Sequence, residues 1–268
     1  MLPSPLPSAL SPPTIASVTV PEPLKLAQLP PPPTSLLQGA SLFLDFDGTL
    51  VPLTDVPEAV EVDADLIGLL ANARDALGGR LAIVSGRSVA TLRDLFGLGD
   101  FLLSGTHGLE FAEPGNAPRG PQRLKAVDEA EAIFTNFIAD KPGLLVERKT
   151  LSVGLHFRRA PEWTDACRVL AEEVALSTGL IIQPGKMLYE LRPGGADKGT
   201  AVAELMKTAP MAGGMPIFVG DDLTDEEGMM AAQALGGCGI LVGPARVTSA
   251  QWHLEQVGAV RHYLLGVP

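Results

Sequence analysis

The 268-residue chain has few cysteines, few basic residues and no long apolar run. Its two cysteines, Cys167 and Cys238, show no CxxC spacing, so neither a disulfide framework nor a zinc site is indicated, and a reducing cytoplasm is the expected location. No apolar run reaches the roughly 18 to 20 residues that a membrane span requires. Twenty Lys and Arg against 31 Asp and Glu give a formal net charge of −11. That balance disfavours nucleic acid and anionic membranes as partners, whereas a small anionic substrate fits if local cations reverse the sign.

The first 36 residues differ from the rest because they are rich in proline and contain one basic residue, Lys25. They lack both the positive start and the continuous apolar core of a signal peptide. We therefore expect residues 1–36 to form a disordered or partly extended tail.

From Ser41 onward, short apolar runs alternate with segments of helical pattern. Each run is apolar along its whole length, as is typical of strands buried on both faces of a parallel sheet. The alternation predicts βαβ units and an open α/β sheet. The expected strands are 41–47, 80–86, 101–108, 216–222 and 239–243, and the expected helices are 63–77, 88–96, 198–208 and 225–235.

This alternation is interrupted in the middle of the chain. Over residues 151–158 apolar and polar residues alternate, which predicts a half-exposed strand, and the preceding LLVE segment can pair with it around Lys149 and Thr150. We interpret the region as a separate small α+β domain inserted into the core. The predicted boundaries are 37–109 and 189–268 for the two core segments and 110–188 for the insertion; within it we expect helices at about 128–138 and 162–177 and strands at 180–183 and 187–191.

Polar side chains follow one apolar run after another. Because the carboxyl ends of parallel strands lie along one edge of a sheet, where ligands bind, residues far apart in sequence should converge there. A serine or glycine at such a place can simply begin a loop, but four aspartates at strand ends need another explanation. The polar groups are Asp45 and Asp47, Ser85, residues 104–107, and Asp221 with Asp222.

Several carboxylates without a nearby His or Cys suit a hard cation, most simply Mg²⁺. Asp45, Asp221 and Asp222 are the candidate carboxylate ligands, and Asp47 can add its backbone carbonyl. Asp45 is then a candidate nucleophile toward phosphorus, which would give an aspartyl-phosphate intermediate. Asp47, two residues on, can protonate the leaving oxygen and later deprotonate the attacking water.

Lys198 and Ser85 complete the candidate catalytic set. Lys198 lies in the first turn of a helix that Asp197 can cap, where a positive charge opposes the helix dipole. A phosphate bound at that helix end would reverse this disadvantage, and Ser85 can serve as a neutral donor. Asp225 has two readings that the sequence leaves open: it supports the metal ligands, or it only begins a helix.

The motifs DFDGT, Ser85, Lys198 and 220-GDDLTDEEG-228 resemble, in order, the four motifs of the haloacid dehalogenase superfamily. The resemblance covers the chain from about residue 40 to its end. A narrower set of motifs is similar to those of the trehalose-6-phosphate phosphatase family: 85-SGRS-88, 105-GTHGLE-110, 147-ERK-149 followed by LHFR, 185-GKMLYELRP-193 and GDDLTDE.

This resemblance implies a haloacid-dehalogenase-like Rossmannoid core with a parallel sheet and an inserted α+β cap. It also implies a magnesium-dependent phosphatase acting on trehalose 6-phosphate, with Glu147, Lys149 and Glu190 of the cap binding the sugar that carries no phosphate. Glu147 and Lys149 are two apart on a strand and so point the same way. Carboxylates and an ammonium group also suit sugar hydroxyls. A solvated hairpin tip is the alternative for this pair.

Arg87 and His107 lie in the matching motifs as well. Arg87 is expected to orient the substrate or to help close the cap onto the core. His107 is expected either to bind substrate or to be a buried structural histidine. His156, His253 and His262 are expected to be structural or surface residues.

Two other functions remain open at this point. The same chemistry can act on another sugar phosphate, because the cap alone would discriminate between sugars. A catalytically inactive sugar-phosphate sensor is disfavoured, because such a domain would be expected to lack Asp45, Asp47, Lys198 or Asp221, and all four are present. The expected partner is a small sugar phosphate, and no oligomeric state is indicated.

Overall fold

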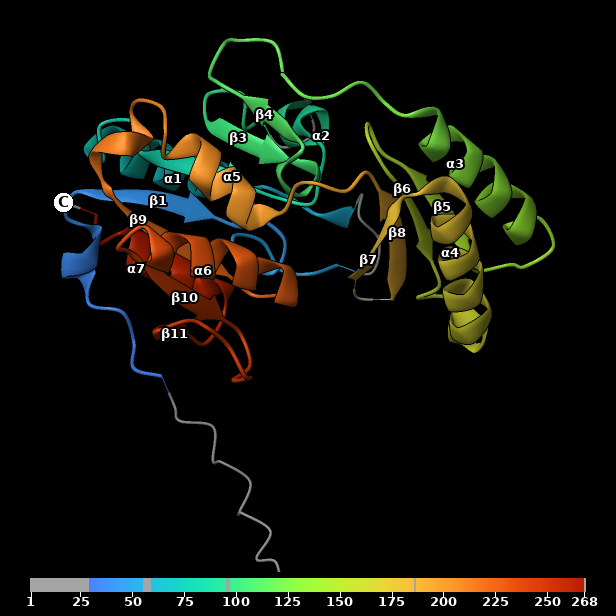
Figure 1. Cartoon of the computed structure of the whole chain (residues 1–268). Coiled ribbons are helices and arrows are strands. Elements are labelled where there is room, and N and C mark those ends of the chain that lie inside the picture. The colour runs from blue at the N-terminus through green and yellow to red at the C-terminus, as the bar shows by residue number, and fades with distance from the viewer. Residues whose placement is uncertain (1–28, 55–58, 95–96, 186, 268) are drawn as a thin grey trace, which may run out of the picture.

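A computed structural model of the chain describes residues 29–54, 59–94, 97–185 and 187–267. It contains a seven-stranded sheet and a four-stranded sheet, each with its own helices (Figure 1). The tail expected over residues 1–36 lies, as far as residue 28, outside the described residues. Within the described ranges, no helix is long and apolar enough to cross a membrane.

The seven-stranded sheet forms the core and has the strand order β11–β10–β9–β1–β2–β3–β4. Its strands are parallel, except that β4 runs antiparallel to β3 at one edge. The five strands predicted from apolar runs are all confirmed. Because β1 lies between β9 and β2, the residues after β1 emerge near the middle of the carboxyl edge. The strands are β1 Ala40–Leu44, β2 Leu81–Val84, β3 Leu102–Gly105, β4 Glu110–Ala112, β9 Met215–Gly220, β10 Cys238–Val242 and β11 Trp252–Leu254.

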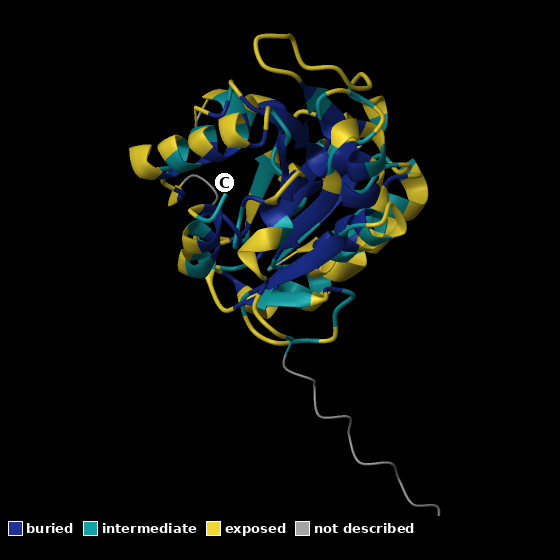
Figure 2. Cartoon of the chain, turned by 90° about the vertical axis from the view of Figure 1, so that its left-hand side faces the viewer, coloured by how far each residue is buried: buried dark blue, intermediate teal, exposed yellow. Residues whose placement is uncertain are grey.

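Helices cover both faces of the core sheet, so the core is a three-layer sandwich with buried strands in its centre (Figure 2). These helices are α1 Ala64–Ala76, α2 Val89–Asp94, α5 Lys198–Leu205, α6 Glu226–Ala234 and α7 Val257–Leu264. Leu42 and Leu44 of β1 pack in the apolar cluster that includes α1 and α7. Phe43, between them, packs in the cluster that includes α5 and α6. This alternation explains why the core strands are apolar along their whole length.

The four-stranded sheet and two helices form the cap. Its order is β5–β6–β8–β7 with antiparallel pairing throughout, and the predicted hairpin around Lys149 and Thr150 is confirmed. Val153 and Leu155 of β6 pack against α3 and α4 in a cap core of their own. The opposite face of the sheet is turned toward the core domain (Figure 1). The elements are α3 Lys125–Ile138, β5 Leu145–Arg148, β6 Val153–His156, α4 Thr164–Thr178, β7 Ile181–Gly185 and β8 Leu188–Arg192.

Strand pairing passes from one sheet to the other slightly later than the predicted boundaries at residues 110 and 188. Strand β4 pairs with β3, with Glu110 opposite Gly105, and so extends the core sheet. Strand β8 pairs with β6 and β7 as far as Arg192, and so extends the cap sheet. The two connections between the sheets are therefore residues 113–124 and 193–197.

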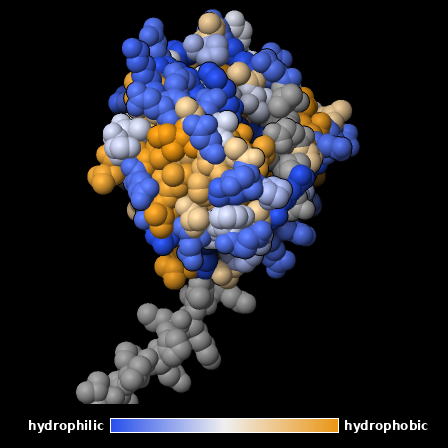
Figure 3. Space-filling view, turned by 90° about the vertical axis from the view of Figure 1, so that its right-hand side faces the viewer, coloured by the Kyte–Doolittle hydropathy of each residue, from blue (hydrophilic) through white to orange (hydrophobic). Residues whose placement is uncertain are grey.

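Apolar side chains also gather on the outer side of the cap (Figure 3). Val169 and Leu176 of α4 are among the exposed apolar residues of this domain. Helix α4 packs on the sheet face that is turned away from the core, so this patch lies away from the surfaces where core and cap meet.

Candidate active site

The candidate site begins at the carboxyl end of β1, where a fully buried strand ends in Asp45. The Asp45 backbone N–H donates to the Val219 carbonyl oxygen over 2.9 Å, which continues the β1–β9 pairing for one more residue. Asp45 is 3% exposed. The apolar run thus holds a carboxylate at the centre of the sheet edge, as its position in the sequence predicted.

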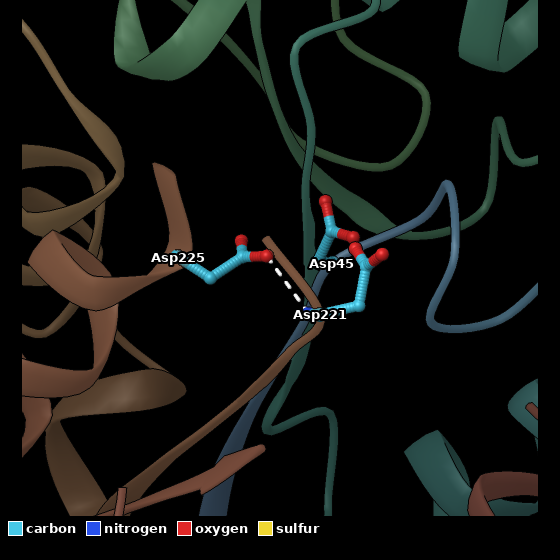
Figure 4. A group of neighbouring side chains, drawn as sticks. All are labelled: Asp45, Asp221 and Asp225. Carbon is cyan, nitrogen blue, oxygen red and sulfur yellow. Dashed lines mark hydrogen bonds between the residues drawn. The ribbon is translucent and has the colours of Figure 1, made fainter. Parts of the chain in front are cut away.

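Three aspartates form a tight cluster at this edge: Asp45, Asp221 and Asp225 (Figure 4). One carboxylate oxygen from each lies within 4.8 Å of the others. Asp221 follows β9, the strand next to β1, and Asp225 ends the 3₁₀ helix η6, Leu223–Asp225. The cluster therefore unites strand-end carboxylates, as the sequence predicted, with a third one from the next turn of chain.

The third member of the cluster is Asp225, whereas the sequence analysis named Asp222. The Asp222 carboxylate accepts from the Leu223 N–H over 2.8 Å and caps η6. Asp225 is fully buried, and its Oδ2 accepts from the backbone N–H groups of Asp221 and Asp222 over 2.9 Å each. Asp225 thus holds the Asp221 loop in place.

Lys198 connects the cluster to helix α5. Its Nζ lies 2.6 Å from Asp45 Oδ1 and 2.5 Å from Asp225 Oδ1, and the residue is 4% exposed. Asp197 caps the helix as predicted, accepting from the Thr200 N–H. Burial would lower the pKa of Lys198, but the Asp225 and Asp45 carboxylates outweigh it and raise that pKa above its ordinary value. Lys198 is therefore a permanently charged bridge between two buried carboxylates.

Lys198 binds two of the three carboxylates, Asp45 and Asp225, and its single charge does not offset both of them. Burial, and then the neighbouring Asp225, raise the pKa of Asp45 well above its ordinary range, although Lys198 opposes this. Carboxylate oxygens gathered at one place are the kind of donor set that hard divalent cations prefer. The residues present therefore fit a magnesium ion, and the Asp45 and Asp221 carboxylates lie close together in the cluster (Figure 4).

Gly48 allows the loop after β1 to approach Asp221. Its φ is +88°, and a Cβ atom at this position would lie 2.2 Å from Asp221 Oδ2. Glycine is therefore required here both for its left-handed backbone and for the missing side chain. The DFDGT sequence brings the aspartates of β1 and β9 together because its fourth residue has no Cβ.

Asp47 lies beside the cluster, and its carboxylate binds Arg87. Arg87 and Asp47 form a bidentate ion pair. Arg87 Nε donates to Asp47 Oδ2 and Arg87 Nη2 donates to Asp47 Oδ1, each over 2.7 Å. Ser85 directly follows β2 and is 1% exposed, and its Oγ accepts from the Arg87 N–H over 3.1 Å. The Ser85 hydroxyl hydrogen is then available to a ligand. The second strand-end motif thus positions one cation and one neutral donor.

His107 is held in a left-handed conformation, with φ 51° and ψ 42°, directly after β3. It is 9% exposed, and its Nδ1 has no hydrogen-bond partner among the described residues. Burial lowers the pKa of His107 to about 3, although Glu190 opposes the effect. His107 is therefore neutral at physiological pH.

Acidification should destabilise the fold through His107. Its pKa is about 3 in the folded chain and about 6.5 in the unfolded chain, so the unfolded state binds one more proton between these values. The free energy of unfolding should therefore fall by about 1.4 kcal/mol per pH unit from about pH 6 to pH 4 because of this residue. The free energy of unfolding in urea should depend on pH more steeply for the wild type than for His107→Asn, by the equivalent of about one bound proton. Asparagine is chosen because it tolerates the left-handed backbone. Equal slopes would contradict the prediction.

The cap contributes Glu147, Lys149 and Glu190 to the same pocket. Lys149 Nζ lies 2.5 Å from Glu190 Oε2 and 3.9 Å from Glu147 Oε2, and Ser152 Oγ donates to Glu190 Oε1 over 2.5 Å. Burial would raise the pKa of Glu190, but Lys149 and His107 outweigh it and bring it down to about 2. The cap therefore presents two charged carboxylates around one shared ammonium group, and the pair is not a solvated hairpin tip.

His156 also lines the pocket, whereas the sequence predicts a structural or surface residue. Its Nε2 lies 2.8 Å from Glu147 Oε2. The sequence does contain a feature that indicates this position: His156 is on the polar face of an alternating strand, together with Ser152 and Gly154. That face meets the core domain instead of solvent.

All of the candidate residues named from the sequence line one pocket between the core and the cap. Asp225 lies beneath it, fully buried. From the core come Asp45, Asp47, Ser85, Arg87, His107, Lys198, Asp221 and Asp222, and from the cap come Glu147, Lys149 and Glu190.

Comparison with known proteins gives concordant results. The trehalose-phosphatase family model matches residues 43–257. The chain is 34% identical over 224 residues to trehalose-6-phosphate phosphatase of Escherichia coli (strain K12), covering 83% of this chain and 84% of that protein. It is 36% identical over 210 residues to a probable trehalose-phosphate phosphatase of Sinorhizobium fredii, covering 78% and 79%.

Solved structures show the same fold. A crystal structure of a trehalose-6-phosphate phosphatase related protein superposes with a TM-score of 0.73 at 30% identity, covering 84% of this chain and 95% of that one. The C-terminal domain of C. albicans trehalose-6-phosphate phosphatase superposes with a TM-score of 0.75 at 24% identity, covering 90% and 98%. Both the parallel core and the inserted cap are therefore features that this chain shares with solved structures.

Proposed function

The chain belongs to the trehalose-phosphatase family, a family of phosphoric monoester hydrolases, and we propose that it hydrolyses trehalose 6-phosphate to trehalose and phosphate. We propose an aspartyl-phosphate intermediate on Asp45. A cytoplasmic location is part of the proposal, because Cys167 and Cys238 are both buried and unpaired, as is usual in a reducing compartment.

A single observation carries this proposal: one pocket contains both a phosphoryl-transfer set and a sugar-binding set. The core side holds a strand-end carboxylate beside a buried lysine, as a nucleophile toward phosphorus requires. The cap side holds carboxylates and an ammonium group, as sugar hydroxyls require. A substrate with a phosphate at one end and a sugar at the other matches this division.

In the first step Asp45 attacks phosphorus. Lys198 already binds Asp45 Oδ1, so Oδ2 is the oxygen that forms the bond to phosphorus. The bond between phosphorus and the sugar oxygen breaks, and that oxygen takes a proton from Asp47. In the second step a water attacks the aspartyl phosphate, Asp47 takes a proton from this water, and Asp45 is released as a carboxylate together with phosphate.

Arg87 controls when Asp47 can act. Both oxygens of Asp47 accept hydrogen bonds from Arg87, so Asp47 must exchange at least one of these contacts before it can hold and transfer a proton. An incoming phosphate is an alternative anionic partner for the guanidinium group. Substrate binding would thus draw Arg87 toward phosphate and leave Asp47 to the sugar oxygen.

The carboxylates of Asp45 and Asp221 and the backbone carbonyl of Asp47 are the proposed magnesium ligands, and Asp225 holds the Asp221 loop through two N–H groups. A bound Mg²⁺ supplies positive charge that lets a carboxylate approach a phosphate dianion. Lys198 supplies part of the same compensation from the protein itself.

A phosphate-release screen over sugar phosphates, with and without Mg²⁺, tests the function. Trehalose 6-phosphate should be the preferred substrate, EDTA should stop the reaction, and Mg²⁺ should restore it. A preference for sucrose phosphate or a mannosyl phosphate would support the proposed phosphatase chemistry but contradict the proposed substrate. Full turnover after exhaustive metal removal would contradict the metal assignment.

Removing Glu147 or Lys149 should selectively impair the sugar substrate. A hydrogen bond to a charged group contributes roughly 1.5 to 3 kcal/mol, so Glu147→Ala or Lys149→Ala should lower kcat/KM for trehalose 6-phosphate by about one to two orders of magnitude. The measurement is this kcat/KM relative to that for p-nitrophenyl phosphate, which offers the cap no hydroxyl groups.

Glu129→Ala, an exposed carboxylate on α3, is the matched control for loss of charge in the cap. Its ratio of the two kcat/KM values should equal that of the wild type. A parallel fall of both activities in Glu147→Ala would show that the cap residues do not recognise the sugar.

A further inference from the structure

Gln183 of β7 is a polar side chain of the cap that lines the pocket and has no role in the reaction described above. Gln183 is the register partner of Glu190 in the antiparallel β7–β8 pair. Across the sheet, Glu190 pairs with Gly154 of β6, and Gly154 pairs with Glu147 of β5. Opposed residues of adjacent strands project from the same face. Gln183, Glu190 and Glu147 therefore form one row across the cap sheet, facing the pocket.

The orientation of the Gln183 amide is determined by Arg192. Arg192 Nη2 donates to Gln183 Oε1 over 3.0 Å. A guanidinium group has no acceptor atom, so the amide oxygen, and not the nitrogen, must face it. Arg192 cannot readily move, because it is 3% exposed and its Nη1 donates to the Ala196 carbonyl over 2.7 Å. The amide nitrogen, Nε2, is therefore directed away from Arg192.

Gln183 Nε2 makes no hydrogen bond within the described part of the chain. The rest of the row offers only acceptors, because Glu147 and Glu190 are carboxylates, and Lys149 Nζ directs two of its three donors at them, which leaves one for a sugar hydroxyl. A sugar hydroxyl donates one hydrogen bond and accepts others, so a wall of carboxylates alone would leave hydroxyl oxygens unpaired. An amide NH₂ beside Glu190 supplies a further donor.

We propose that Gln183 is a further substrate-binding residue, whose Nε2 donates to a hydroxyl of the sugar unit that carries no phosphate. Glu190, its neighbour in the row, accepts from an adjacent hydroxyl of the same ring. Gln183 and Glu190 would then bind two neighbouring hydroxyls, one by donating and the other by accepting a hydrogen bond. The inference rests on the proposed function in one respect: the leaving group is a polyhydroxylated sugar.

The variant Gln183→Glu separates this role from a structural one. Glutamate keeps an oxygen for Arg192 and replaces only the donor nitrogen with an oxygen that cannot donate. We expect kcat/KM for trehalose 6-phosphate, relative to that for p-nitrophenyl phosphate, to fall about tenfold. Gln122→Glu, which adds the same charge at an exposed position of the cap connection, should keep the wild-type ratio. A wild-type ratio in Gln183→Glu would overturn the proposal, because the bond to Arg192 would then be all that Gln183 supplies.

Deoxy analogues of the substrate locate the contact. The analogue lacking the hydroxyl that Nε2 binds should be hydrolysed at similar rates by the wild type and Gln183→Glu, whereas the other deoxy analogues should keep the tenfold difference. An unchanged difference for every analogue would overturn the proposal. If the wild type prefers another sugar phosphate, the proposed function fails, and the same comparison made with that substrate still decides the role of Gln183.

Discussion

Replacing Asp45 by asparagine should reduce phosphate release by roughly a thousandfold or more for every substrate, including p-nitrophenyl phosphate. The amide is nearly the same size as the carboxylate but is not a nucleophile toward phosphorus. Sugar phosphates and aryl phosphates should be affected alike, because both depend on the same bond from Asp45 to phosphorus. Steady-state phosphate release with both substrates is the measurement.

The same variant should be at least as stable as the wild type. Burial and Asp225 raise the pKa of Asp45 well above its ordinary range, which means that the folded state disfavours the charged carboxylate. A neutral asparagine avoids this penalty, and its side-chain oxygen can still accept from Lys198. The melting temperature in EDTA should therefore stay the same or rise. Asp165→Asn, at a fully exposed carboxylate of α4, is the control; substantial activity in a verified Asp45→Asn preparation would contradict the mechanism.

The core fold and the position of the nucleophile were predictable because they depend on local pattern. An apolar run such as residues 41–44 must be buried on both faces, and this requirement implies a parallel sheet with helices on both sides. Because ligands bind at the carboxyl edge of such a sheet, the sequence alone predicts that Asp45, Ser85 and Asp221 lie close together. The structure shows these residues around one pocket.

The choice between Asp222 and Asp225 depends on features that the sequence pattern does not contain. Both follow the same strand, and both are suitable residues for the start of a helix. The conformation of the short η6 turn directs Asp222 to cap Leu223 and Asp225 into the protein beneath Asp221. The inward carboxylate also makes a tertiary contact, the bond from Lys198 to Asp225, which a local sequence pattern cannot indicate.

Two features of the cap also could not be predicted from the sequence. Alternation placed His156 on the polar face of its strand, but whether that face meets solvent or the core domain depends on how the cap packs. Gln183 lies in a strand too short for its period to be recognised. Its place beside Glu190 follows from the register of β7 and β8, which is a property of pairing between strands and not of either strand alone.

Replacing Lys198 by methionine should damage both activity and stability. Methionine fills a similar volume but leaves Asp45 and Asp225 buried without the ammonium group that binds both. Breaking a buried ion pair by removing one partner costs about 3 to 5 kcal/mol. We expect a loss of this size in the free energy of unfolding in EDTA, measured by urea denaturation. Lys207→Met is the control, because Lys207 is an exposed lysine that follows the same helix and pairs with Glu204. It should change the free energy of unfolding by less than about 1 kcal/mol.

Two further measurements distinguish the charge of Lys198 from its packing. Mg²⁺ should stabilise Lys198→Met more than it stabilises the wild type, because the cluster has then lost the ammonium group that binds Asp45 and Asp225, and binding to the folded state shifts unfolding. Adding Asp225→Asn to Lys198→Met should recover much of the stability, since one buried charge is removed, while activity stays low because Asp45 still lacks its partner. If the double variant is no more stable than Lys198→Met, or if Mg²⁺ stabilises all variants equally, the bridge between Asp45 and Asp225 is not what Lys198 contributes to the fold.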